Sequence, residues 1–443
     1  MLLTKPSVLN EKEVVNTIQK HTHPLNNGKD LKPLFDRIGD ARIVMLGEAS
    51  HGTHEYYTWR AHISKRLIEE KGFNFIAVEG DWPDCYRLNR YVKGYEGDEK
   101  DAVDVLKDFN RWPTWMWANW EIVALAEWLK QHNIGLSVHK KTGIYGLDVY
   151  SLWESMESIM QYLEKTDPAA YHLAEEAFNC FEPYRKDEGR SYAEALNFVP
   201  KLCQKEVVNL LKEVRRRIPL YNSDFENVFS VEQNALVAVN AEKYYEAMLA
   251  GGANSWNVRD QHMANTLDRL LDFHGENSKA IIWEHNTHIG DARATNMPAN
   301  GMYNLGQLVR VQHQNKGVVL VGFGSYEGTV LAGNGWGAPM KTMPVPAATK
   351  GSWEYFLHQA GAKNKLLIMA NFKNNDAMMK NYIGHRAIGV VYHPEHEHRG
   401  NYVPSILPSR YDAFIYLDQT KALHPLNTKV DKQQMPETYP FGV

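Results

Sequence analysis

The chain has 443 residues, of which 44% are hydrophobic, 11% aromatic and 23% charged, a balance that excludes disordered and fibrous proteins. The 49 Lys and Arg residues nearly balance the 53 Asp and Glu residues, so the net charge is −4 and no basic excess points to nucleic acid or an anionic membrane surface. The sequence has neither a signal peptide pattern nor an apolar run of about 18 residues, so we expect a soluble, cytoplasmic protein.

The cysteines also bear on the compartment. Cys85, Cys180 and Cys203 are odd in number and show no C-x-x-C spacing. This pattern favours neither a disulfide framework nor a thiolate metal site, and it fits a reducing compartment.

The first part of the chain alternates between strand and helix patterns. Residues 41–47 (ARIVMLG) and 74–80 (NFIAVEG) are short apolar runs that predict buried strands, and the amphipathic segment 53–72 between them predicts a helix. Further helices are expected from about residue 83 and over the Trp-rich residues 113–131, before a strand at 144–149. Such alternation predicts an α/β fold, with a mostly parallel sheet flanked by helices in three layers.

The pattern changes after Tyr150. Residues 151–250 contain amphipathic stretches and no convincing strand, which predicts a helical insertion. Strand character then returns at 279–283, 317–324, 365–370, 387–393 and 412–418. We therefore divide the chain into a first part of the α/β core (1–150), the insertion (151–250), a second part of the core (251–345), and a smaller α/β portion with the C-terminal tail (346–443).

Acid and base groups follow two of the predicted strands. The segment LGEASHGTHEYY (46–57) places Glu48 and His51 at a strand end, and Glu79 ends the next strand. In open α/β sheets the carboxyl ends of the strands face the ligand crevice, so these groups are expected along one rim. A neutral His51 could take a proton from water. The alternative is a solvated turn that only caps the following helix.

A third cluster follows the strand at 279–283 and contains Glu284, His285 and His288. Two histidines three residues apart share a helix face and could bind metal, but the H-E-x-x-H arrangement is absent. Ser50 lacks the G-x-S-x-G frame of a nucleophile, and no nucleotide-binding motif occurs, so no cofactor is predicted. Two other groups favour structural roles, in a solvated loop and in core packing respectively: His393, His396 and His398, and the tryptophans at 112, 115, 117 and 120.

Several blocks together resemble the erythromycin esterase family, whose members are also labelled succinoglycan biosynthesis proteins. These blocks are LGEASHGTHEYY, VEGDWPD (78–84), YGLDVYSLW (145–153), WNVRDQHMA (256–264) and WEHNTHIGDAR (283–293). The resemblance implies an α/β core with a helical insertion and a deep cleft. It also implies metal-independent hydrolysis of a macrolide lactone, with the histidine of G-E-x-x-H-G as general base. The family's cleft residues correspond here to Glu48, His51, Arg60, Glu79, His285 and His288.

The resulting hypothesis is a hydrolase in which water attacks an ester or lactone of a small molecule. His51 takes the proton, Glu48 orients His51, and Glu79 orients the water or the imidazole. His285 or His288 stabilises the oxyanion or protonates the leaving alcohol, and Arg60 binds a substrate carboxylate.

Two alternatives remain open. One is a metal-dependent hydrolase whose ligands are His51, Glu79, His285 and His288. The other is a non-catalytic cleft protein that binds an apolar ligand such as haem. A role in antibiotic resistance depends on whether macrolides are accepted, and the sequence fixes neither the substrate nor the oligomeric state.

Overall fold

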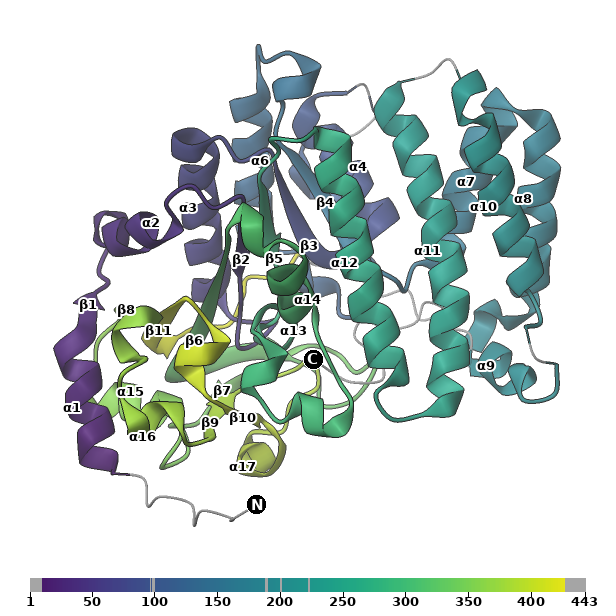
Figure 1. The fold of residues 1–443 in the computed structure, drawn as a ribbon. Helices are drawn as coiled ribbons and strands as arrows, with labels where there is room; N and C mark the ends of the chain where they lie inside the picture. Colours follow the sequence, from purple (N-terminus) through teal and green to yellow (C-terminus); the bar gives the residue numbers. More distant parts are fainter. Residues whose placement is uncertain are drawn as a thin grey trace.

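A mixed sheet of nine strands forms the centre of the computed structural model, which describes residues 10–426 except 96, 98–99, 188–189, 200 and 222–223 (Figure 1). The strand order is β1-β8-β11-β6-β2-β5-β3-β4, and β7 pairs with β6. The six strands from β11 to β4 run parallel, whereas β1, β7 and β8 pair antiparallel with their neighbours. The strands are β1 (Thr22–Pro24), β2 (Ile43–Leu46), β3 (Phe75–Asp81), β4 (Gly143–Asp148), β5 (Ala280–Trp283), β6 (Val318–Ala332), β7 (Lys341–Val345), β8 (Lys365–Ile368) and β11 (Ala413–Thr420).

Helices cover both faces of this sheet, because side chains alternate between the faces along each buried strand. Val44 and Leu46 of β2 join one buried apolar cluster, and Ile43 and Met45 join the other. The first cluster receives side chains from α2 (Lys32–Ile38), α3 (His54–Lys71), α4 (Trp82–Lys93), α5 (Ala102–Leu106) and α6 (Trp120–Asn133). The second receives them from α1 (Glu11–His21), α12 (Asn254–His274), α13 (Asn286–Ile289), α14 (Leu305–Gln312), α15 (Trp353–Gln359), α16 (Asp376–Met379) and α18 (Leu407–Arg410). The predicted three-layer α/β class is confirmed.

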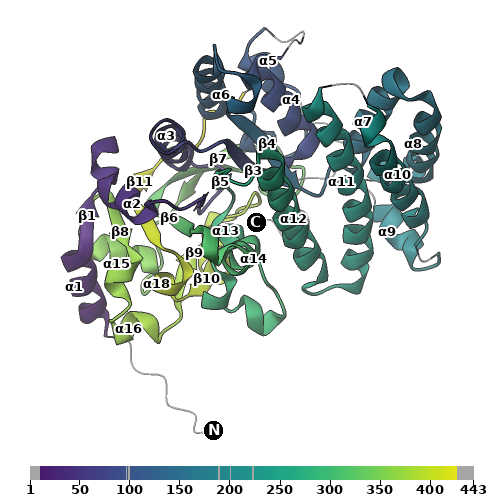
Figure 2. The same ribbon diagram turned by 45° about the horizontal axis from the view of Figure 1, so that its top comes forward.

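The stretch predicted as a helical insertion consists, in its described residues, of helices joined by short turns, and it has its own buried apolar cluster. It packs beside the core, against α4 and α12, and Figure 2 shows it as a separate stack of helices. Its helices are α7 (Leu152–Thr166), α8 (Pro168–Phe181), α9 (Arg190–Leu196), α10 (Gln204–Arg217) and α11 (Phe225–Ala250).

The C-terminal part contributes to the central sheet. β11 lies between β6 and β8, while a separate antiparallel pair is formed by β9 (Ile383–Arg386) and β10 (Tyr402–Ser405), beside α17 (Glu397–Gly400). The predicted strand at 387–393 is wrong: this segment makes only isolated bridges, Ile388 with Ser50 and Val391 with Gly333. Ile388 and Tyr392 of this segment pack in a small apolar cluster with residues of β6 and β7.

The predicted Trp-rich helix also differs from the structure. Trp115 lies in a 3-10 turn, and α6 begins only at Trp120, because Asn119 caps it by accepting a hydrogen bond from the backbone N–H of Ile122 at 2.8 Å. Trp112, Trp115 and Trp117 are buried in the core as predicted, whereas Trp120, also expected to pack in the core, is 54% exposed.

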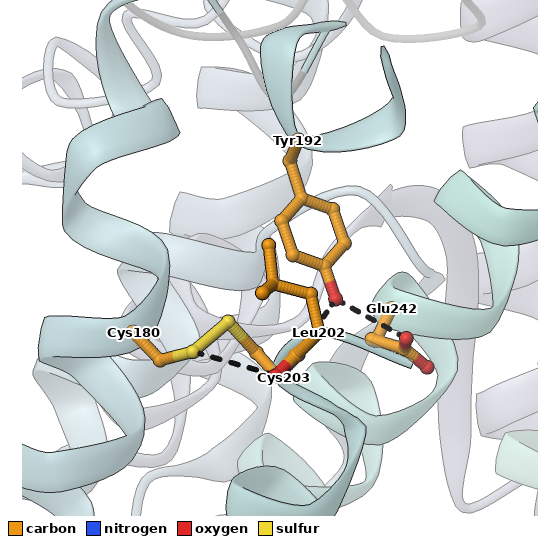
Figure 3. The surroundings of a disulfide bond; sticks show 5 residues. All are labelled: Cys180, Tyr192, Leu202, Cys203 and Glu242. Atoms are coloured by element: carbon orange, nitrogen blue, oxygen red, sulfur yellow. Dashed lines mark hydrogen bonds between the residues drawn. A yellow bond between two sulfur atoms is a disulfide. The ribbon is translucent and has the colours of Figure 1, made fainter. Parts of the chain in front are cut away.

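The structure corrects the expectation that the cysteines are unpaired. Cys180 and Cys203 form a disulfide within the helical insertion, across a sequence separation of 23 residues (Figure 3). The Tyr192 hydroxyl beside it accepts from the backbone N–H of Cys203 and donates to Glu242, each at 3.2 Å. Counting three cysteines could not reveal this pair, and the pairing removes the argument for a reducing compartment.

Membrane insertion through a helix finds no support in the described part of the chain. None of its helices combines the length and apolar character that crossing a bilayer requires.

Candidate active site

The ends of three neighbouring parallel strands bring the predicted site residues together. Leu46 of β2 and Val78 of β3 both lie in register with Trp283 of β5, so the residues that follow these strands share one rim. Each of the six predicted side chains is at most 2% exposed: Glu48, His51, Arg60, Glu79, His285 and His288. The site is therefore an interior polar cluster, in which electrostatic interactions are little screened.

His51 is oriented by Glu48. Its Nδ1 lies 3.0 Å from Glu48 Oε1, and because a carboxylate only accepts, Nδ1 carries the proton. In the neutral ring Nε2 then holds the lone pair, and this atom has no hydrogen-bond partner among the described residues. A general base requires this arrangement: an oriented imidazole with one free basic nitrogen.

Arg60 binds the second carboxylate oxygen of Glu48. From α3, its Nη2 donates to Glu48 Oε2 at 2.6 Å, and its guanidinium lies over the rings of Tyr57 and Trp283. Arg60 thus forms a buried ion pair with Glu48, while its contact with a substrate carboxylate stays a prediction. Arg60 fixes Glu48, and Glu48 in turn fixes His51.

His285 has the opposite tautomer to His51. Its Nδ1 accepts from the backbone N–H of Thr287 at 3.3 Å and lies 2.8 Å from the Thr287 hydroxyl, which assigns the proton to Nε2. Burial and the nearby His51 lower the pKa of His285 well below its ordinary value, so the ring is neutral. The ring centroids of His51 and His285 are 4.9 Å apart. The site therefore pairs a proton acceptor with a neutral N–H donor.

Glu79 is held by a buried arginine from α12. Arg259 Nη2 donates to Glu79 Oε1 at 2.7 Å and to Asp148 Oδ2 at 2.6 Å, and the backbone N–H of His285 donates to Glu79 Oε2 at 2.9 Å. Burial alone would raise the pKa of Glu79, but His288 and Arg259 lower it far below its usual range. Glu79 is thus an ionised group that ties β3 to the loop carrying His285.

Glu284 lies beside this ionised carboxylate in the opposite charge state. It is fully buried, and neither of its carboxyl oxygens has a hydrogen-bond partner within the described part of the chain. Burial, followed by the negative charges of Glu79 and Asp260, raises its pKa well above the ordinary value. Two neighbouring carboxyl groups with opposite pKa shifts are typical of active sites.

His288 completes the network from the short helix α13. Its Nδ1 lies 3.0 Å from Asp260 Oδ1, its Nε2 lies 2.9 Å from Arg259 Nη1, and its ring stacks on Trp256 at 4.5 Å. Burial lowers the pKa of His288, but the negative charges of Asp260 and Glu79 raise it by more. The net pKa therefore lies above the ordinary value of histidine. In the neutral ring, the unprotonated Nε2 accepts from Arg259. A protonated ring would instead direct its Nε2 proton towards Glu79 Oε1, which lies 3.5 Å away.

A cleft of about 430 Å³ lies next to this cluster, although none of the six predicted residues lines it. Its lining includes Thr287, which contacts His285, and Trp256, which stacks on His288. The lining contains no charged side chain: Trp256, Thr287, Asn296, Met297, Asn300, Met302, Trp336, Ala387, Gly389, Val391, Gly400, Asn401 and Val403. The cleft suits an uncharged molecule with apolar surface and a few hydrogen-bonding groups.

The donor set of the metal-dependent alternative does not fit a cation well. Glu79 already bonds to Arg259 and to the backbone of His285, and His288 is bound between Arg259 and Asp260. A metal ion at these ligands would lie beside the Arg259 guanidinium, and repulsion between the two charges opposes binding.

Three residues of this network were not predicted, Asp148, Arg259 and Asp260, and a fourth, Glu284, was named in the third cluster without an assigned role. Asp148, Arg259 and Asp260 lie in the blocks YGLDVYSLW and WNVRDQHMA, which carried the family resemblance without an assigned role. Glu284 directly follows an apolar strand, as Glu48 and Glu79 nearly do. This position at the end of a strand is the signal by which the sequence could have assigned Glu284 to the site. His393, His396 and His398 are exposed as predicted, although His396 and His398 lie in short helices rather than in a loop.

Comparisons with known proteins place this chain in a family. The erythromycin esterase family model matches residues 68–420, which include Glu79, Arg259, His285 and His288 and begin after Arg60. The match covers most of the sequence. The chain belongs to the erythromycin esterase family. Membership of the family supports an esterase-like hydrolase with a small-molecule substrate.

Individual relatives of this family member are distant. "Erythromycin esterase type II" of Escherichia coli is 25% identical over 288 residues, which cover 61% of this chain and 66% of that protein, slightly under two thirds of its length. A crystal structure of a succinoglycan biosynthesis protein has a TM-score of 0.73 at 22% identity, covering 95% of this chain and 100% of that one. A mutant of the erythromycin esterase EreC in its open conformation has a TM-score of 0.68 at 16% identity, covering 93% and 99%. At these identities, the two structures show a shared fold.

Proposed function

We propose that this protein hydrolyses a carboxylic ester or lactone by direct attack of water, with His51 as the general base. The observation that carries the proposal is the unpartnered Nε2 of His51, on a ring whose Nδ1 donates to Glu48. Glu48 is itself fixed by Arg60, so His51, Glu48 and Arg60 form one buried chain of contacts.

The reaction proceeds through two proton transfers at His51. Nε2 takes a proton from water as the water oxygen attacks the carbonyl carbon, and the Nε2–H of neutral His285 donates to the oxygen that becomes negative. When the carbon–oxygen bond to the alcohol breaks, His51 returns the proton to the leaving oxygen. Atoms and charge balance without a covalent enzyme intermediate.

Glu79 and His288 act by positioning in this scheme. Glu79 accepts from the backbone N–H of His285, and Arg259 binds Glu79 and His288 together. These contacts fix the direction in which His285 donates. Glu284, held as a neutral acid, places no second negative charge beside Glu79.

The substrate class follows from the cleft. Its lining is apolar with asparagine amides and has no cation for a carboxylate, so the proposed substrate is an uncharged, partly apolar ester or lactone. The family name makes macrolide lactones candidates to test, and a role in antibiotic resistance follows if they are accepted.

The experiment is incubation of the purified protein with macrolides, simple lactones and neutral esters, followed by mass spectrometry. Addition of one water to any of them supports the proposal, and no addition to any of them contradicts it. The same reactions with chelator separate the metal-dependent alternative, which predicts loss of activity. A haem titration addresses the binding alternative, which predicts a Soret band and no hydrolysis.

A further inference from the structure

A second cluster of histidine and glutamate lies on the outside of the loop that carries His51. His54 is the first residue of α3, Glu121 is the second residue of α6, and His424 lies in the C-terminal segment 421–426 after β11. Three segments far apart in the sequence thus place two imidazoles around one carboxylate, and nothing in the proposed catalysis uses them.

The ligand atoms of this cluster converge. His54 Nδ1 lies 2.5 Å and His424 Nδ1 lies 2.7 Å from the same oxygen, Glu121 Oε1. All three atoms lie within 4.8 Å of one another, and the two rings are nearly perpendicular, with centroids 5.1 Å apart. Among the described residues, this is the one group of three or more His, Cys, Asp or Glu side chains with such spacing.

We propose that His54, Glu121 and His424 bind a divalent transition-metal ion, with zinc as the best match. Two imidazole nitrogens and one carboxylate oxygen are ligands that zinc prefers, and exposure of the site leaves a fourth position for water. The side chain of His424 is 62% exposed and that of His54 is 31% exposed, whereas Glu121 is only 4% exposed. The buried carboxylate is therefore the fixed ligand, and the two rings can rotate outward. In a tetrahedral site with metal–ligand bonds of about 2.0 Å, neighbouring ligand atoms lie about 3.3 Å apart. Both imidazole nitrogens would therefore move slightly away from Glu121 Oε1 when a metal ion binds.

The surrounding charges favour a cation on balance. Glu55, in the first turn of α3, adds a second carboxylate near His54, against the single positive charge of Lys421. Glu55 Oε2 accepts the backbone N–H of Lys421 at 2.8 Å, which holds the C-terminal segment in place. The two helix N-termini carry partial positive charge, and the Glu121 carboxylate offsets it.

The metal would fasten the C-terminal segment to the loop that carries the general base. That segment already bonds through its backbone, since the N–H of His54 donates to the Lys421 carbonyl at 2.8 Å and the N–H of Leu423 to the Gly52 carbonyl at 3.0 Å. Gly52 directly follows His51. Metal bound at His424 would add side-chain ligation to these contacts, so we expect metal to stabilise the folded chain.

The test is titration of the full chain, freed of metal by chelator and dialysis, with zinc in a calorimeter and with cobalt in a visible spectrometer. We expect one ion per chain, a tetrahedral cobalt spectrum, and an increase of melting temperature with zinc. Both His424→Ala and His54→Ala should weaken binding at least 10-fold. His396→Ala, an exposed histidine elsewhere, and His51→Ala should bind as the wild type does.

Three results would overturn the proposal. These are no binding tighter than about 1 mM, binding unchanged in folded His424→Ala and His54→Ala, or binding lost in His51→Ala but kept in the other two. The last result would assign the metal to the catalytic cluster. Circular dichroism of each variant establishes that it is folded, and His424→Ala removes a mostly exposed ring, so its folding is not at risk.

Discussion

His51 and His54 lie three residues apart in the sequence, and each pairs with a glutamate: His51 with Glu48 in the interior, and His54 with Glu121 in the outer cluster. In the interior pair, the two oxygens of Glu48 have different partners, His51 and Arg60, and His51 keeps a free Nε2. In the outer cluster, two imidazoles share one oxygen of Glu121. Residue type alone does not separate a base from a chelating site. What separates them is how many partners each carboxylate oxygen has, and how deeply the rings are buried.

The interior pair depends on a surrounding charge network, and removing its central cation should have the largest effect on stability. Arg259→Met leaves Glu79 and Asp148 buried without their shared cation. Removing one partner of a buried ion pair costs roughly 3–5 kcal/mol, so we expect this decrease in the free energy of unfolding, measured with urea. His54→Ala is the matched change in the outer cluster. An equal decrease in its free energy of unfolding would contradict the distinction between an interior charge network and an exposed cluster.

Arg60 distinguishes positioning from substrate binding. In Arg60→Gln, Glu48 loses its anchor and His51 loses its orientation, so kcat should fall about 10- to 100-fold with KM little changed. If Arg60 instead held a substrate carboxylate, KM would rise and kcat would be kept. Steady-state kinetics on the best substrate of the panel decides between the two outcomes.

The outer cluster should show a smaller, pH-dependent effect in the metal-free protein. The hydrogen bond to Glu121 raises the pKa of His54 above its ordinary value of 6.5, with Glu55 adding to this effect and Lys421 opposing it. A raised folded-state pKa contributes stability below pH 6.5, and this contribution is lost as the pH rises through the higher folded value. The effect is small because the His54 side chain, which is 31% exposed, is screened by solvent.

Melting curves of wild type and His54→Ala measure this effect. The difference in melting temperature between them should shrink as the pH rises from 6 to 9. A difference that is independent of pH would show that His54 contributes packing rather than charge.

The sequence predicted more of the fold than of the contacts within the site. Apolar runs that end in Gly or Glu marked the strands, and the positions of Glu48, Glu79 and His285 after them placed these residues on one rim. The partners of the site residues come from much farther away: Arg259 lies 180 residues from Glu79 and 111 from Asp148. Periodicity within one segment carries no information on such contacts. The Cys180–Cys203 disulfide was missed for the same reason.

The central claim is that His51 removes the proton from the attacking water, and the most direct measurement is kcat for His51→Ala. His313→Ala is the control, because His313 is also buried and paired with a carboxylate, its Nε2 lying 2.6 Å from Asp268. General base catalysis is worth on the order of 10² to 10⁴ in rate, so the account predicts a loss of at least about 100-fold in His51→Ala, with His313→Ala close to wild type. Unchanged hydrolysis by folded His51→Ala would contradict it.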